Sequence, residues 1–82
     1  MKAIHLIYRH HKTQQEYQLI DIAIHSETRE EMVVYKALYN CPNYGYGKLW
    51  VRPKKMFFEK VFYCNEWVSR FKLIDTADND SN

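Results

Sequence analysis

The chain has 82 residues, enough for one domain with a modest core, because a chain of this length buries roughly 60–65% of its unfolded surface. Its hydrophobic fraction of 46% is that of an ordinary globular protein, and a net charge of +2 is too small to identify a nucleic-acid-binding protein by itself. Residues 1–12 lack the apolar run of a secretory signal, and nothing approaches the ~20 apolar residues of a membrane-spanning helix, so we expect a cytoplasmic protein.

Two strands are predicted in the first part of the chain, over residues 4–11 and 16–25. Side chains of one parity share one face of a strand, and in the first strand that face would carry Ile4, Leu6, Tyr8 and His10. The second strand has apolar residues at both parities, interrupted by Asp21. This pattern indicates a strand that is partly covered on its second face, or one that contains a β-bulge.

Residues 32–39 allow two interpretations. Thr28 and Glu31 match a capping box, which would start a short helix. The run Val33-Val34-Tyr35 is β-branched and aromatic, which favours a strand. We predict a strand and keep the helix as the alternative.

The second half of the chain is predicted to contain a loop, three strands and one helical turn. Residues 40–48 form the loop, because they hold one proline and two glycines. A strand over 49–52 ends at Pro53, and 53–57 suit one helical turn that begins with this proline. Further strands are expected over 58–63 and 67–74. Residues 75–82 contain three aspartates and few apolar groups, which predicts a disordered acidic tail after a single domain over 1–74.

Five to six short strands with one single-turn helix indicate an all-β fold, and the order of the elements suggests a small SH3-like barrel. No internal repeat is evident. Cys41 and Cys64 lack the paired spacing of a metal site, so we expect two free thiols. The predicted core residues are Ile20, Ile22, Val33, Val34, Leu49, Val51, Met56, Phe57 and Phe71.

Several segments in this order resemble a small bacterial family catalogued as domain of unknown function 1653. The segments are Tyr8-Arg9-His10 with Lys12, His25-Ser26-Glu27-Thr28, Val33-Val34-Tyr35 with Leu38-Tyr39, and Trp50-Val51-Arg52-Pro53 with Met56-Phe57 and Glu59. The resemblance covers about residues 7–73. It implies a short single domain and no specific biochemical activity. The chain departs from the family pattern at Thr13, where a glycine is usual, and in the longer loop over 40–48.

Residues 25–28, His-Ser-Glu-Thr, have the chemistry of a base, a nucleophile and an orienting acid. Neighbouring residues on an extended chain point apart, however, so we interpret this segment as a turn and assign no catalytic residue. His10 and His25 on adjacent strands, with Glu27, are the best metal ligands in the sequence, but zinc needs three or four ligands. We therefore predict no metal and no cofactor, and an enzyme ranks last.

A basic run follows the loop, with Lys48, Arg52, Lys54, Lys55 and Lys60 close to Trp50, Tyr44 and Tyr46. Aromatic and basic side chains together suit nucleic acid, because the rings stack on bases and the cations follow the phosphates. The simpler interpretation is a solvated face that keeps the protein soluble.

We predict a non-enzymatic binding module for nucleic acid or a nucleotide. The alternative is a protein-interaction module that binds an extended peptide in the same groove. The candidate ligand-binding residues are Arg9, His10, His25, Glu27, Tyr35, Trp50 and Arg52.

Overall fold

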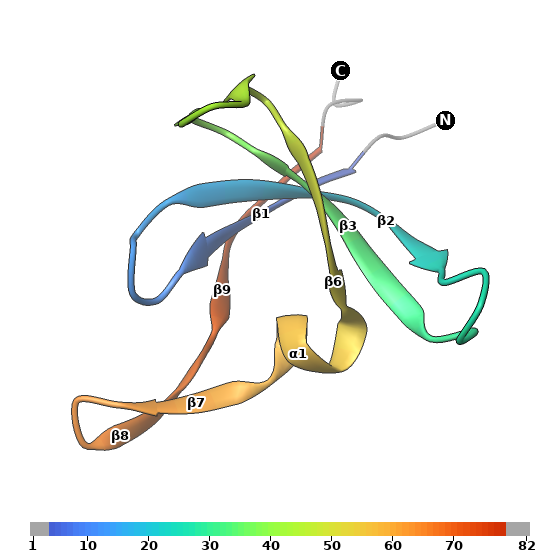
Figure 1. Cartoon of the computed structure of the whole chain (residues 1–82). Coiled ribbons are helices and arrows are strands. Elements are labelled where there is room, and N and C mark those ends of the chain that lie inside the picture. The colour runs from blue at the N-terminus through green and yellow to red at the C-terminus, as the bar shows by residue number, and fades with distance from the viewer. Residues whose placement is uncertain (1–3, 79–82) are drawn as a thin grey trace.

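The computed structural model describes residues 4–78, which form antiparallel strands and one short helix (Figure 1). In chain order the elements are β1 (Ile4–His10), β2 (Glu16–Ile24), β3 (Glu31–Ala37), β4 (Asn40–Cys41), β5 (Gly45–Tyr46), β6 (Leu49–Pro53), α1 (Lys54–Phe58), β7 (Lys60–Tyr63), β8 (Glu66–Ser69) and β9 (Phe71–Asp78). No described helix has the length and apolar character needed to cross a membrane.

The main sheet has five strands in the order β6-β3-β2-β1-β9. Figure 1 shows α1 on one side of this sheet, which we call the inner face, and the β7–β8 hairpin extending beyond the helix. The pairing register shifts between Leu19 and Asp21 in β2, which is the β-bulge that the mixed parity suggested. The bulge lets Tyr17, Leu19 and Ile22 all pack against the core, and it leaves Ile20 46% exposed.

The strand prediction for the third segment is confirmed, because β3 pairs with β2 on one side and β6 on the other. Val33, Tyr35 and Ala37 alternate with less buried residues, and all three are buried. Bonding on both edges satisfies the backbone of this β-branched run better than a two-turn helix would.

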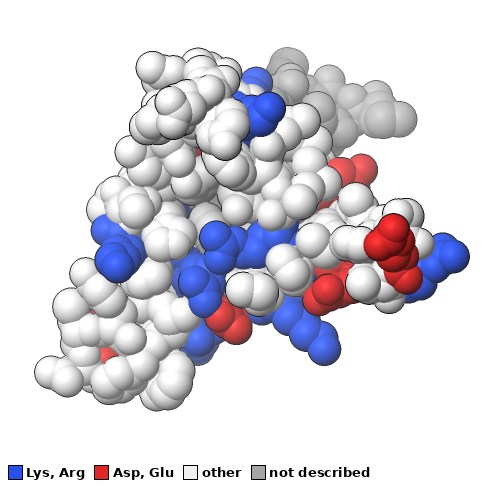
Figure 2. Space-filling model, viewed as in Figure 1, with Lys and Arg blue, Asp and Glu red and all other residues white. Residues whose placement is uncertain are grey.

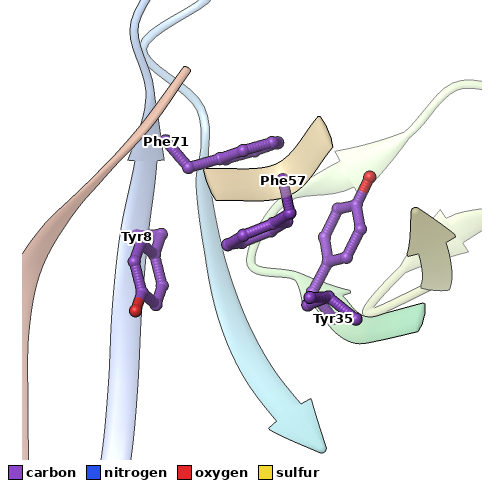
Figure 3. Close-up of a cluster of buried hydrophobic side chains, with 5 residues drawn as sticks. Tyr8, Tyr35, Phe57 and Phe71 are labelled. Atoms are coloured by element: carbon purple, nitrogen blue, oxygen red, sulfur yellow. The ribbon is translucent and has the colours of Figure 1, made fainter. Parts of the chain in front are cut away.

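The core is a cluster of aromatic rings around Phe57, the one fully buried side chain of α1 (Figure 3). Its ring stacks on Phe71 with 4.2 Å between centroids, and lies 5.2 Å from both Tyr8 and Tyr35. These residues come from β9, β1 and β3, so α1 inserts one ring into the concave face of the twisted sheet. Aromatic packing of this kind lets a short chain bury a large area with few residues.

An all-β fold is confirmed, but the described residues form no closed barrel. β6 and β9 are the two edges of the sheet, and β4–β5 and β7–β8 are separate hairpins. The predicted strand 67–74 divides at Arg70: Ser69 belongs to β8, which pairs with β7, and Phe71 begins β9, which pairs with β1. The amide of Arg70 donates to the carbonyl of Glu59 at this point. Trp67, at the start of the predicted strand 67–74, is 66% exposed on the hairpin.

Three predicted boundaries need smaller corrections. The loop over 40–48 contains the β4–β5 hairpin, whose two glycines take positive φ angles of 87° and 78°. Phe58 belongs to α1, so the strand expected from residue 58 begins at Lys60. β9 continues to Asp78, because backbone pairing with β1 extends the strand regardless of its acidic side chains. Residues 79–82 of the predicted tail lie outside the described residues.

Some predicted core residues lie on the wrong face. Val51 is 61% exposed and Leu49 is 54% exposed, because they alternate with Trp50 and Arg52, which face inward opposite Tyr35 and Val33. Val34, the partner of Val51, is only partly buried on this outer face, and Met56 is 43% exposed. Ile22, Val33, Phe57 and Phe71 do belong to the core or pack against it. Cys41 and Cys64 are free thiols, as predicted, the first buried and the second exposed.

Candidate functional site

The predicted site residues lie in three places. His10, Tyr35, Trp50 and Arg52 face the inner side of the sheet. Arg9 lies on the outer side, where it forms an ion pair with Glu16 at 3.0 Å. His25 and Glu27 lie at the β2–β3 turn, at the opposite end of β2 from His10.

Arg52 is the least compensated charge on the inner side. The side chain is partly buried, its Nε donates to the hydroxyl of Tyr35 at 3.4 Å, and its guanidinium carbon lies 5.5 Å from the centre of the Phe71 ring. None of the ion pairs found among residues 4–78 involves Arg52. A partly desolvated cation without an acidic partner attracts anions.

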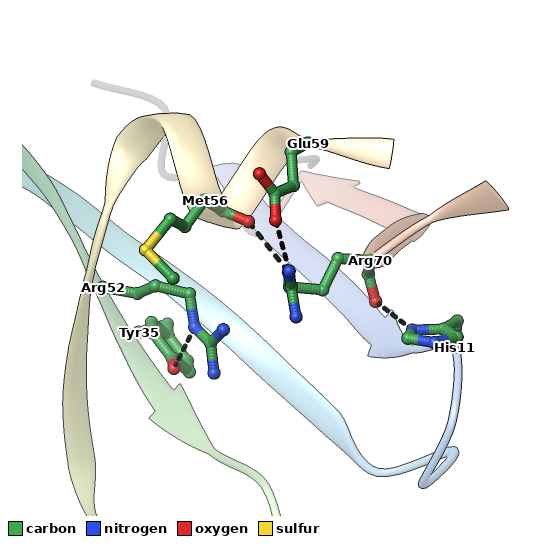
Figure 4. Close-up of polar contacts among 6 residues, drawn as sticks. All are labelled: His11, Tyr35, Arg52, Met56, Glu59 and Arg70. Carbon is green, nitrogen blue, oxygen red and sulfur yellow. Dashed lines mark hydrogen bonds and ion pairs between the residues drawn. The ribbon is translucent and has the colours of Figure 1, made fainter. Parts of the chain in front are cut away.

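Arg70 lies beside this group but is neutralised by its own contacts (Figure 4). It pairs with the carboxylate of Glu59, and its Nε donates to the carbonyl of Met56 at 3.1 Å. Figure 4 shows both guanidinium groups between α1 and the sheet, with Arg52 entering from β6 and Arg70 from the residue before β9. Residues at the end of α1 therefore hold Arg70 in place. Arg52, in contrast, keeps hydrogen-bond donors free.

His10, at the end of β1, contacts Phe71 in the same region as Arg52. Its ring makes an edge contact with Phe71 at 5.0 Å and stacks on His11 at 4.9 Å. Its Nδ1 accepts hydrogen bonds from the amides of Lys12 and Thr13 at 3.2 and 3.4 Å. Burial lowers the pKa of His10 below 6.5, and the positive charges of His11, Arg52, Arg70 and Lys12 lower it further. The ring is therefore neutral near pH 7, with the proton on Nε2.

Thr28 and His25 have the same role in the next turn that Thr13 and His10 have in the first. The Nδ1 of His25 accepts from the amides of Glu27 and Thr28 at 3.2 and 3.3 Å. In both turns the residue after the threonine, Gln14 or Arg29, has a positive φ and donates its amide to the histidine carbonyl. The threonine hydroxyl accepts a hydrogen bond from the amide two residues further along the chain, that of Gln15 or Glu30.

The two turns therefore correspond to a short repeat in the sequence, although none was expected. Residues 10–16, HHKTQQE, align with residues 25–31, HSETREE, at a spacing of 15 positions. In each copy the imidazole replaces the side-chain oxygen that caps many turns. The turn interpretation of residues 25–28 fits this geometry, and His25 and Glu27 are not part of the site around Arg52.

The positions of His10 and His25 in two different turns also argue against a metal site that they share. His10 and His25 would have to meet to share an ion, and nine residues of β2 separate the two turns. Among residues 6–76, whose side chains the structure describes, no three His, Cys, Asp or Glu side chains gather as metal ligands would.

The other end of β6 carries the exposed aromatic groups. Trp50 packs against the core, and the ring of Tyr44 makes an edge contact with it at 5.4 Å. Tyr44 is 60% exposed, and the Nζ of Lys48 lies 5.7 Å from the centre of its ring. Lys54 and Lys55 instead line a hollow with Arg29, Glu30 and Glu31, where Lys54 pairs with Glu31. Lys48 and the pair Lys54 and Lys55 thus lie at the two ends of β6.

Figure 2 shows basic side chains gathered across the middle of the face that carries α1, and acidic ones near the β2–β3 turn. We call the inner side of β6 with its neighbours, from Lys48 and Tyr44 through Trp50 to Arg52 and His10, the β6 surface.

The model for the protein family of unknown function DUF1653 matches residues 6–73. The chain belongs to this family. No curated protein and no solved structure matches it. The segments through which the chain resembles DUF1653 have different tasks in the structure: residues 25–28 form a turn, Tyr35 and Phe57 form the core, and Arg52 lies on the β6 surface.

Three residues near the β6 surface in this DUF1653 domain were not predicted. Arg70 gave no sequence signal, because its neighbours in a predicted strand are ordinary. Tyr17 and Tyr39 share a hydrogen bond of 2.7 Å between their hydroxyl groups, beside Tyr35. Burial, followed by the bond to Tyr39, raises the pKa of Tyr17 far above its usual value of 10.0.

We predict that protonation of His10, the histidine of the β1–β2 turn, destabilises the fold at acid pH. The folded protein lowers the pKa of His10 below 6.5, so the unfolded chain binds this proton more tightly. The contribution of His10 to stability is therefore complete above about pH 6.5 and is lost as the pH falls through its folded pKa. Urea titrations between pH 7 and 5 should show a declining free energy of unfolding, and His10→Asn, which keeps an acceptor but does not titrate, should decline less. Equal slopes for both proteins would contradict the role of His10.

Proposed function

We propose that this domain is a non-enzymatic binding module for single-stranded nucleic acid, which lies along the β6 surface. The observation that carries the proposal is the guanidinium group of Arg52, which is partly buried and lacks an acidic partner among the described residues. Such a fork grips a phosphate with two parallel hydrogen bonds, as it does a carboxylate.

The exposed aromatic ring near β6 also favours a nucleic-acid ligand. Tyr44 is exposed at one end of the β6 surface, with Lys48 beside its ring. Base stacking on such a ring contributes about 1–3 kcal/mol and depends little on sequence. A strand that stacked on Tyr44 and placed a phosphate at Arg52 would follow the length of β6.

The test is a titration of a fluorescently labelled single-stranded oligonucleotide followed by anisotropy. Arg52→Gln should weaken binding about tenfold or more and reduce the dependence on log salt concentration by about one. Arg52→Lys should keep the salt dependence while losing affinity, because it keeps the charge without the fork.

Arg29→Gln is the matched control, since Arg29 lies at the β2–β3 turn beside the acidic residues. It should bind as the unmodified protein does. No binding at low salt would overturn the proposal, and so would an Arg52→Gln variant that binds normally.

An extended peptide is the second candidate, favoured by the edge of the sheet. Within the described residues β6 pairs only with β3, so its other backbone edge has no strand partner. A peptide strand can add to such an edge. Its binding would respond much less to salt than phosphate binding, because it releases few counterions.

A further inference from the structure

A cleft separate from the β6 surface lies where the β7–β8 hairpin leaves the sheet. Its volume is about 500 Å³, within the usual range for small-molecule sites. Figure 1 shows that the hairpin and the β1–β2 turn project on the same side of β9. Its lining residues are Arg9, His11, Gln14, Tyr63, Val68, Ser69 and Lys72.

One part of this lining is cationic. Arg9 and Lys72 are register partners on β1 and β9, so the two positive side chains lie next to each other on one face. Glu16 neutralises Arg9, with which it pairs at 3.0 Å. Lys72 takes part in none of the ion pairs among residues 4–78, so one positive charge remains uncompensated.

The opposite part of the lining offers a flat surface. Tyr63 ends β7 and is 42% exposed. Its ring meets that of His11 at 5.0 Å and an angle of 80°, an edge contact that fixes the ring without stacking over it. His11 is itself held, because its Nδ1 lies 3.3 Å from the carbonyl of Arg70. Val68 adds apolar surface and Ser69 a hydroxyl group.

We propose that this cleft binds one nucleotide, with the base against Tyr63 and the phosphate between Arg9 and Lys72. The inference rests on the proposed function for its class of ligand. A cleft of about 500 Å³ is much larger than a phosphate ion and is also lined by Tyr63, so a phosphate alone would leave the aromatic part of the lining unused. Either a free nucleotide or the 5′-terminal nucleotide of a strand has this chemistry.

The test is an NMR titration of the ¹⁵N-labelled protein with adenosine 5′-monophosphate. We expect shifts of the amides of His11, Tyr63 and Lys72, and weaker binding of adenosine and of inorganic phosphate. Tyr63→Ala and Lys72→Gln should each weaken binding about tenfold, whereas Tyr63→Phe should keep it, because the ring provides the stacking surface. Lys55→Gln, which changes an exposed lysine beside the acidic β2–β3 turn, should bind normally.

Two short oligonucleotides separate the two sources of the ligand. If the cleft takes the end of a strand, a 5′-phosphorylated oligonucleotide displaces the monophosphate and a 5′-hydroxyl one does not. If it takes a free nucleotide, neither displaces it. Both results support the cleft as a nucleotide site.

The inference is overturned if millimolar monophosphate leaves the cleft amides unshifted, or if Tyr63→Ala and Lys72→Gln bind it normally while their spectra show a folded protein. The two proposals fail separately. Monophosphate binding without oligonucleotide binding would remove the β6 surface as a nucleic-acid site, and Arg52-dependent oligonucleotide binding without cleft shifts would remove the cleft alone.

Discussion

Replacing Phe57 by alanine is expected to lower the free energy of unfolding by about 3–5 kcal/mol, the usual loss for a buried phenylalanine. Its side chain has no exposed surface and joins α1 to rings from β1, β3 and β9. Small domains are only marginally stable, with free energies of unfolding of about 5–15 kcal/mol. The loss is therefore a large share of the total stability.

Urea denaturation followed by circular dichroism measures this loss. Phe58→Ala is the matched control, because Phe58 is the next residue of α1 and is 44% exposed. It should cost much less than Phe57→Ala. Similar losses for the two variants would mean that α1 does not insert Phe57 into the sheet as described.

Replacing Trp50 by alanine should have the second largest effect, a loss of about 2–3 kcal/mol. The loss is below the value for complete burial, because the ring is only partly buried where it packs against the core. Tyr44 would also lose its aromatic partner at 5.4 Å, so the exposed end of the β6 surface should become less ordered. Thermal unfolding and oligonucleotide binding of the same variant measure both consequences.

Trp50→Phe separates packing from hydrogen bonding. The Nε1 of Trp50 is buried and has no hydrogen-bond partner among the described residues. An unpaired buried donor costs about 1–3 kcal/mol, and phenylalanine removes the donor while it keeps a ring. This variant should unfold within about 1 kcal/mol of the unmodified protein, since the loss of ring area and the relief of the donor oppose each other. A loss as large as that of Trp50→Ala would contradict this account.

The two candidate sites differ in how the fold builds them. On the β6 surface, Arg52 has only the Tyr35 hydroxyl as a side-chain acceptor among the described residues, whereas Arg70 pairs with Glu59. In the cleft, Arg9 shares its charge with Glu16, and Lys72 provides the excess positive charge. Both sites are modest in charge, which agrees with a net charge of only +2. Few phosphates would be neutralised, so we expect the affinity to fall only moderately as the salt concentration rises.

Residues 10–16 and 25–31 show how local sequence can mislead about function and still report structure. A histidine next to serine and glutamate looks like catalytic machinery. In the structure the Nδ1 of His25 accepts backbone amides, and the matching contacts of His10 reveal the same turn. The repeat was visible as a histidine and a threonine three residues apart in both segments. The sequence did not show that the imidazole acts as an acceptor, because that depends on the backbone conformation of the turn.

The sequence alone determined the strand character of most of the chain, the short helix after Pro53, the free thiols and the resemblance to the family. These features depend on local propensity and on the order of segments, which need no knowledge of the neighbouring strands.

Only the tertiary structure decided which face of each strand is covered. From the alternation of side chains in the strand, either Val51 or Arg52 could face the core. Arg52 pairs with the buried Val33 and therefore faces inward, which leaves Val51 on the outer face. The bulge in β2 shifted the parity again, and Arg70 approached Arg52 because β9 returns to pair with β1. A strand has two faces with a period of two residues, so its own sequence does not specify which face its neighbours will bury.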